Sequence, residues 1–252
     1  METNKRKQKI MDLLKTNGSV KVADLSEMFK ISEVTIRTYL ADMEKKGLLS
    51  RVHGGAISSY KPYYSMDMTQ RLETNQSEKV EIANKIAKMI EPNDTVMLNS
   101  GTTTLLTFRK FPTDYNLNIV TNSIAIALEA SGNPNYNVIL IGGALNTKYQ
   151  FSFGIDAISQ LKNYHADKFV LSVDGIDPLN GFTTYYDKEA EVDRIMIEQS
   201  DKCIVAADFS KFNRSAFVKI ADIAVADCIV TNAPVDEKIL SEFEDTKTQI
   251  LF

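Results

Sequence analysis

Two stretches decide how the first part of this chain folds: residues 31–40, ISEVTIRTYL, and residues 47–56, GLLSRVHGGA. Ser32 suits the N-cap of a helix, because its hydroxyl can accept a hydrogen bond from a backbone N–H of the first turn. An apolar stripe follows at helical spacing, formed by Ile36, Leu40 and Met43. The pattern predicts a recognition helix followed by a short β-wing, the arrangement of a winged helix-turn-helix domain.

The face of this helix opposite the stripe carries small, polar and cationic side chains, which suit base edges and phosphates better than a packed core. We expect DNA contacts from this face, the helix start and the wing, at Ser32, Glu33, Val34, Thr35, Arg37, Thr38, Ala41, Lys45, Arg51 and His53. For His53, a DNA contact and a purely local hydrogen bond both stay open. Two further helices are expected upstream, over residues 5–16 and around the stripe Val22, Leu25, Met28 and Phe29.

Charge separates the two parts of the chain. Residues 1–57 hold eleven Lys and Arg against seven Asp and Glu, a net charge of +4, whereas the remainder has a net charge of −8. A small helical bundle with solvated faces would explain the stripes alone, but a basic part beside an acidic body is typical of a nucleic-acid-binding module. We therefore predict a winged helix-turn-helix over residues 1–57, a linker over 58–75 and an α/β domain over 76–252.

The composition disfavours several other classes. No apolar run approaches the ~18 residues needed to span a membrane, so we expect no membrane partner. Cys203 and Cys228 each lie in an apolar, strand-like segment and are expected to be buried free thiols, which fits the cytoplasm. Two histidines and two cysteines, widely separated, make no metal site, and we expect no cofactor. The sequence contains neither the Gly-x-x-x-x-Gly-Lys-Ser/Thr loop that binds nucleotide triphosphates nor the Gly-x-Gly-x-x-Gly fingerprint that binds dinucleotides.

From residue 76 onward, helical stripes alternate with short apolar strands. Strands are expected at residues 95–98, 118–120, 137–141, 166–173, 203–207, 226–230 and 248–251. Helices are expected at residues 78–90, 124–130, 155–162, 188–199 and 236–243. One more helix is expected to include Leu105 and Phe108. Alternation of this kind predicts a mainly parallel sheet covered by helices, and ligands on such sheets bind beyond the carboxyl ends of the strands.

Polar and glycine-rich segments follow five successive predicted strands at that edge. Each segment alone resembles an ordinary helix cap or turn, but five together favour a ligand site. The residues that we expect to bind an effector are Ser100, Gly101, Thr102, Thr103, Asn122, Gly142, Gly143, Asp174, Gly175, Asp177, Glu189 and Lys211. Hydroxyls, backbone N–H groups and a lysine suit a phosphate, whereas carboxylates suit the hydroxyls of a polyol. A phosphorylated sugar satisfies both requirements.

The N-terminal part resembles the DNA-binding domain of the DeoR family of bacterial transcriptional regulators. The resemblance rests on Ile31-Ser32, on Thr35-Ile36-Arg37 and on the wing motif Arg51-Val52-His53-Gly54-Gly55-Ala56. One position departs from the family, which usually continues Arg-Arg-Asp-Leu where this chain has Arg37-Thr38-Tyr39-Leu40. Because position 38 lies at the centre of the outward face, we hypothesise that this protein recognises an operator unlike that of most relatives.

The resemblance extends over essentially the whole chain. The DeoR sensor domain is similar in fold to ribose-5-phosphate isomerase, and Ser100-Gly101-Thr102-Thr103 resembles its phosphate loop. Asp174-Gly175-Ile176-Asp177 resembles its Asp-Gly-Ala-Asp segment, and Lys211 resembles the lysine that follows a later strand. The family implies a sugar phosphate or a related metabolite as effector. Asn99 replaces the family's usual aspartate, which removes one negative charge beside the expected anion site.

These patterns lead us to expect a sequence-specific DNA-binding regulator without catalytic residues, and the family resemblance implies a repressor of sugar-metabolism genes. Its expected partners are a double-stranded DNA operator, a phosphorylated sugar and further copies of itself in a homodimer or larger homo-oligomer. Two alternatives stay open. One is a sugar-phosphate isomerase with an appended DNA-binding domain, in which Glu189, Glu191 or Asp174 would be the base. The other is a protein that has lost sensing.

Overall fold

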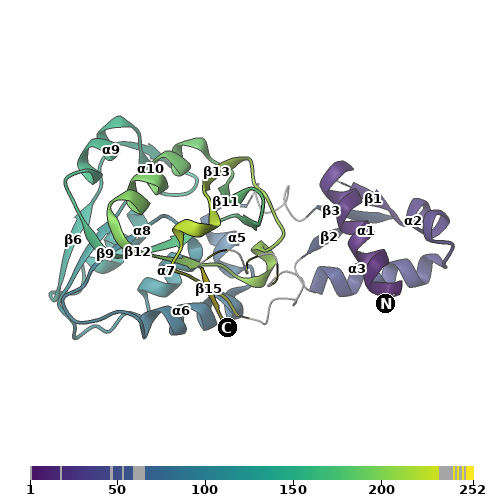
Figure 1. Ribbon diagram of the computed structural model, residues 1–252, viewed down its shortest axis with the longest axis horizontal. Helices are drawn as coiled ribbons and strands as arrows, with labels where there is room; N and C mark the ends of the chain where they lie inside the picture. Colours follow the sequence, from purple (N-terminus) through teal and green to yellow (C-terminus); the bar gives the residue numbers. More distant parts are fainter. Residues whose placement is uncertain are drawn as a thin grey trace. The chain divides into compact units, whose positions relative to one another are not determined.

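The chain forms two compact units, Met1–Met66 and Asp67–Phe252 (Figure 1). The computed structural model describes residues 2–17, 19–45, 48–52, 54–58, 66–232, 241, 243, 246 and 248–252. Among these residues, no helix has both the length and the apolar character needed to cross a membrane.

The first unit is a winged helix-turn-helix, as predicted. Its elements are α1 (Glu2–Asn17), β1 (Ser19–Lys21), α2 (Val22–Phe29), α3 (Glu33–Lys45), β2 (Leu49–Val52) and β3 (Gly55–Ser58). The predicted stripe residues Ile36, Leu40 and Met43 are each at most 1% exposed and share a core with Leu14 and Leu25. The strands form an antiparallel sheet in the order β1-β3-β2. The first strand was not predicted, because three residues are too few to show a period.

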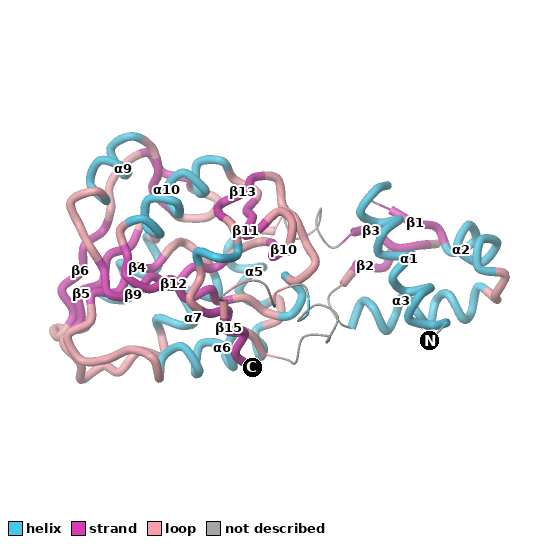
Figure 2. Tube along the Cα trace, viewed as in Figure 1, coloured by secondary structure: helices cyan, strands magenta, loops and turns pink. Residues whose placement is uncertain are grey.

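Seven parallel strands form the central sheet of the second unit (Figure 2). In spatial order they are β15 (Gln249–Leu251), β14 (Cys228–Val230), β12 (Ser200–Ala206), β9 (Ala166–Ser172), β4 (Thr95–Leu98), β5 (Leu117–Thr121) and β6 (Tyr136–Leu140). From β4 the chain adds strands on one side through β5 to β6, and from β9 it adds them on the other side. The strand order therefore reverses between β4 and β9, the kind of position where open α/β sheets bind ligands.

Helices cover both faces of this sheet. Successive side chains of a strand point to opposite faces, so a strand that is apolar throughout needs a covering layer on each side. In β4, Val96 and Leu98 belong to one buried core, whereas Met97 belongs to the other. The first core contains residues of α6 (Gln76–Ala87), α7 (Thr102–Phe108) and α8 (Ile124–Ala130). The second contains residues of α9 (Ile155–Leu161) and α10 (Asp187–Glu198). The result is the three-layered, mainly parallel α/β domain that the alternation predicts.

Three features of the second unit differ from the sequence prediction. A short helix, α5 (Met68–Glu73), lies within the predicted linker. The segment after β9, predicted as loop, forms β10 (Gly175–Asp177) and β11 (Gly181–Thr184), which make an antiparallel sheet with β13 (Val218–Ala221). A further hairpin pairs β7 (Ala144–Asn146) with β8 (Phe151–Phe153). These elements are too short for a periodic pattern, and their pairing comes from tertiary contacts. Most of the helix predicted at residues 236–243 lies outside the described residues.

Candidate functional site

In the first unit, α3 presents the face that the sequence predicts to meet DNA. Ser32 caps the helix, because the Thr35 N–H donates to Ser32 Oγ at 3.2 Å. Val34 is 70% exposed at the start of the outward face. The remaining predicted contacts of this helix are exposed or half-buried: Glu33, Thr35, Arg37, Thr38, Ala41 and Lys45. The apolar stripe thus fills the core while the predicted contact face stays available.

Thr38, at the centre of this face, and Arg37, on its flank, make contacts within the helix itself. Arg37 Nη2 lies 2.5 Å from Glu33 Oε2, and the Thr38 hydroxyl donates to the Val34 carbonyl at 3.0 Å. An exposed ion pair is worth little in water, so Arg37 can exchange Glu33 for a base edge or a phosphate. The internal contact of Thr38 leaves only a short, uncharged group at the centre of the face.

The wing is joined to the recognition helix by two hydrogen bonds that were not predicted from the sequence. Glu44 on α3 accepts hydrogen bonds from the Arg51 backbone N–H and from Arg51 Nε, both at 2.7 Å. The backbone bond is the largest cause that lowers the pKa of Glu44, followed by the bond from the guanidinium. Arg51, predicted as a DNA contact, therefore also positions the wing. His53, predicted beside it, lies outside the described residues.

In the second unit, the residues that follow β4 and β9 are joined directly by hydrogen bonds. Asn99 is fully buried, and its side chain both accepts from the Ser172 N–H and donates to the Ser172 carbonyl, each at 3.0 Å. Gly101 follows two residues later. A Cβ atom at this position would lie only 1.7 Å from Ser172 Oγ, so the close approach of the two strand ends requires a glycine.

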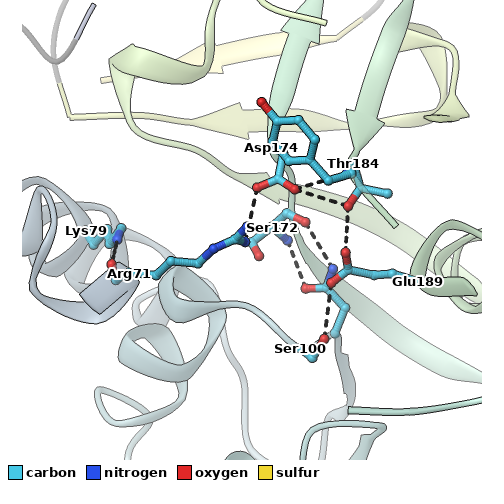
Figure 3. A network of polar contacts seen from close by, with 9 residues as sticks. Arg71, Lys79, Ser100, Ser172, Asp174, Thr184 and Glu189 are labelled. Carbon is cyan, nitrogen blue, oxygen red and sulfur yellow. Dashed lines mark hydrogen bonds and ion pairs between the residues drawn. The ribbon is translucent and has the colours of Figure 1, made fainter. Parts of the chain in front are cut away.

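Five polar side chains, here called the strand-end cluster, meet at this point: Arg71, Ser100, Asp174, Thr184 and Glu189 (Figure 3). The Ser100 hydroxyl donates to Glu189 Oε1 at 3.2 Å. Thr184 Oγ1 lies 2.6 Å from Glu189 Oε2 and 3.2 Å from Asp174 Oδ2. Arg71 Nη1 lies 3.4 Å from Asp174 Oδ1. The cluster joins α5, the ends of β4 and β9, β11 and α10 at the position where the strand order reverses.

Two carboxyl groups of α10 hold protons more tightly than usual. Burial and then the charge of Asp174 raise the pKa of Glu189 to about 7, against the opposing effects of Thr184, Arg71 and Ser100. The Thr184 hydroxyl has one hydrogen to share between two carboxyl groups, which fits a proton on Glu189. Burial, and then the charge of Glu189, also raise the pKa of Asp193 well above its usual value.

The side chain of Asn99 donates a hydrogen bond to the buried carboxyl group of Asp193. Its Nδ2 lies 3.2 Å from Asp193 Oδ1, in addition to its bond with the Ser172 carbonyl. Both donor hydrogens of the Asn99 amide are therefore used inside the protein. An aspartate at this position would place a second carboxylate against Asp193. The asparagine at position 99 therefore affects its buried hydrogen bond with Asp193, in addition to the charge beside the loop that follows β4.

A second polar group follows β12. Asp208 accepts from Asn75 Nδ2 at 3.2 Å and from the Ser210 N–H at 3.0 Å. Burial acts to raise the pKa of Asp208, but the charge of Lys211, the bonds from Ser210 and the charge of Lys79 together lower it. Both lysines are buried, Lys211 at 4% and Lys79 at 1% exposure. Asp208 is therefore an ionised group beside two cations.

The other predicted effector residues have local structural contacts. Asn122 is fully buried and donates to the Ser152 carbonyl at 3.1 Å, whereas the Gly142 N–H donates to Gln160. Asp177 accepts from the Leu179 and Asn180 N–H groups, so its side chain closes the β10–β11 turn. Four further positions are buried or constrained by close backbone contacts: Thr102, Thr103, Gly143 and Gly175. None of these residues has a described bond to the strand-end cluster.

Three residues of this region were not predicted from the sequence: Arg71, Thr184 and Asp193. For Arg71 a signal exists, because Asp67 and Gln70 have the spacing of a capping box and form one at the start of α5. Thr184 becomes a site residue through the antiparallel pairing of β10 and β11, which no local pattern predicts. Among the described residues, no group of three or more His, Cys, Asp or Glu is placed to hold a metal ion.

Family models match both units of the chain. The model of the DeoR-like helix-turn-helix domain matches residues 6–61, and that of the DeoR C-terminal sensor domain matches residues 74–233. This chain belongs to the DeoR family of transcriptional regulators. The helix-turn-helix therefore binds DNA, and the α/β unit that carries the strand-end cluster is the family's sensor domain.

Similar proteins cover nearly the whole chain. It is 34% identical to the HTH-type transcriptional regulator YulB of Bacillus subtilis, over 97% of this chain and 95% of that protein. It is 29% identical to the glycerol-3-phosphate regulon repressor of Escherichia coli K12, over 99% of both chains. These DeoR-family relatives are named as regulators and not as enzymes, which favours regulation over the isomerase alternative.

A solved structure of ribose 5-phosphate isomerase A from Methanocaldococcus jannaschii is similar over 55% of each chain, with a TM-score of 0.42 and 14% identity.

Replacing Arg37 tests the DNA-binding face. We expect Arg37→Ala to weaken specific operator binding about fivefold or more, because one good base contact is worth ~1–3 kcal/mol. The melting temperature should stay close to that of the wild type, since this side chain is 56% exposed. Fluorescence anisotropy with a selected operator duplex measures the affinity, and Lys9→Ala on α1 serves as an exposed cationic control. An unchanged affinity would contradict the assignment of this face.

Replacing Glu189 tests the electrostatics of the cluster. Glu189 has a pKa of about 7 in the folded protein, well above the ordinary glutamate pKa of 4.5. Stability should therefore fall as the pH rises through this window, and Glu189→Gln should remove an effect of up to about 3 kcal/mol. We expect the melting temperature of the variant, relative to wild type, to be higher near pH 8 than near pH 5.5. Glu198→Gln, at the exposed end of α10, is the control. If the melting temperatures of Glu189→Gln and wild type differ by the same amount at both pH values, the pKa of Glu189 is not raised.

Proposed function

We propose that this protein is a repressor of sugar-metabolism genes, and that a phosphorylated sugar bound at the strand-end cluster and Lys211 controls its DNA binding. One observation carries the proposal. Hydroxyls and carboxyl groups of the sensor domain meet the guanidinium of Arg71 where the strand order reverses, between β4 and β9. This is the usual ligand position on an open α/β sheet.

The chemistry of these groups supports a ligand with both hydroxyls and an anionic group. Asp174 and Glu189 can accept hydrogen bonds from sugar hydroxyls, and the Ser100 hydroxyl can donate to either part of the ligand. Ser100 immediately precedes Gly101 and α7, so its hydroxyl lies beside the start of that helix. Lys211 supplies a buried cation at the end of the neighbouring strand β12. A relative named for the glycerol-3-phosphate regulon agrees with an effector of this class.

Control of DNA binding requires more than affinity for the effector. The effector has to bind the free and the DNA-bound forms unequally, because a ligand with equal affinity for both shifts no population. We propose that the protein acts as a homodimer or a larger homo-oligomer, since paired recognition helices on one duplex read half-sites about one helical turn apart. Effector binding would then change the spacing or orientation of the paired heads.

A thermal-shift titration tests the effector class. We expect one phosphorylated sugar in a panel of pentose, hexose and polyol phosphates to raise the melting temperature by mass action, while its unphosphorylated parent has a much smaller effect. Lys211→Met should remove this response and leave operator affinity within about twofold of wild type, because the lysine lies in the sensor domain. Lys162→Met, an exposed lysine after α9, is the matched control. A wild-type response in Lys211→Met would exclude that lysine from the site.

A further inference from the structure

We infer that Arg71 is an effector-binding residue: its guanidinium receives the anionic group of the effector, and α5 thereby forms one wall of the effector site. This inference deepens the proposed function and rests on it. Arg71 lies in a segment that the sequence assigns to a linker, upstream of every strand of the central sheet. Its side chain nevertheless reaches the strand-end cluster (Figure 3).

The guanidinium of Arg71 is positioned by an aromatic ring as well as by a carboxylate. Its Cζ lies 4.5 Å from the centre of the Tyr149 ring, and Nη1 lies 3.4 Å from Asp174 Oδ1. The side chain is 11% exposed, so it is largely withdrawn from bulk water. Stacking on a ring orients the planar group, and a planar fork matches two oxygens of a phosphoryl group better than an ammonium does.

The backbone that carries Arg71 is anchored at both ends of α5. At the start, Asp67 and Gln70 form a reciprocal capping box. At the end, Lys79 Nζ lies 2.5 Å from the Arg71 carbonyl oxygen and 2.7 Å from that of Thr74. The guanidinium is thus presented in one place before any ligand arrives. Such preorganisation lowers the entropic cost of binding.

The charges around Arg71 allow an anion to bind there. Arg71 is the cation among the described groups that shift the pKa of Glu189. Arg71 also forms an ion pair with Asp174. Glu189 and Asp193 both retain protons more strongly than usual, which reduces the negative charge facing an incoming phosphoryl group. Lys211, which follows β12, and Lys79, on α6, both lie close enough to Asp208 to lower its pKa. Arg71 therefore serves the end of the ligand nearest β4 and β9.

This position gives α5 a direct part in sensing. In the chain, α5 is the first described helix after the winged helix-turn-helix unit. An effector that binds Arg71 stabilises this helix against local opening. We therefore expect hydrogen exchange of the amides of residues 68–74 to slow when the effector is bound, and this slowing to disappear in a variant without the guanidinium.

Calorimetric titration of three variants tests the inference. The probes are ribose 5-phosphate, glucose 6-phosphate and glycerol 3-phosphate, each with its unphosphorylated parent, and inorganic phosphate. For the phosphorylated compound that binds the wild type, we expect Arg71→Gln to weaken binding at least about tenfold, or about 1.4 kcal/mol. Arg71→Lys, which keeps the charge without the fork, should lose less. Arg109→Gln removes an exposed arginine paired with Glu129 at the far end of α7 and should leave binding unchanged.

The outcomes separate the inference from the proposed function. If the wild type binds a phosphorylated sugar and Arg71→Gln binds it equally well, the inference is overturned while the proposed function stands. An equal loss for the phosphorylated compound and its parent would make Arg71 merely structural and would also overturn it. If the wild type binds none of the phosphorylated compounds, both fall. Should Arg71→Gln fail to fold, Arg71→Lys decides, and wild-type affinity in that variant would count against the inference.

Discussion

The sensor domain is organised around the carboxylate of Asp174, which has to find partners away from bulk water. Asp174 is 8% exposed, and a buried charge is costly unless it is paired and hydrogen-bonded. Its partners come from separate parts of the chain: Arg71 of α5, the Thr184 hydroxyl at the end of β11 and the Tyr185 N–H. Satisfying this one group brings a segment from before the central sheet to the ends of its middle strands.

The same arrangement explains why neighbouring groups carry unusual protonation. Asp174 is ion-paired with Arg71, whereas burial and then the neighbouring negative charge raise the pKa values of Glu189 and Asp193. A site with one cation, one carboxylate and carboxyl groups that hold protons can offer both donors and acceptors. That balance suits a ligand that combines hydroxyls with an anionic group. The DNA-binding unit follows a simpler logic, in which an apolar stripe fills the core and the opposite face stays polar.

The sequence predicts the parts of this protein whose pattern is local. Ser32 caps α3 and the stripe from Ile36 to Met43 is buried, because N-caps and helical periods are set by residues a few positions apart. The order of strands and helices in the sensor domain follows in the same way. Ser100, Asp174 and Glu189 could be named because each sits at or near the end of a strand or helix that a pattern predicts.

The rest depends on contacts between distant residues. Arg71 meets Asp174 across 103 positions of the chain, and Asn99 meets Asp193 across 94. Asp177 looks like a ligand-binding aspartate in the sequence, but its carboxylate closes a hairpin turn that exists only because β10 pairs with β11. Arg51 looks like a free cation of the wing, but Glu44 lies within reach once the wing folds back on α3. No local pattern contains this information.

The most direct test of the account is the effector dependence of operator binding in Asp174→Asn. Fluorescence anisotropy would follow the operator complex of the wild type and the variant as a phosphorylated sugar that binds the wild type is added. Asparagine keeps the shape of the side chain but loses the charge that holds Arg71. Without effector, we expect Asp174→Asn to bind the operator with wild-type affinity; when effector is added, we expect little or no change in that affinity. A variant that responds at the same effector concentration as the wild type would contradict the claim that sensing depends on the strand-end cluster.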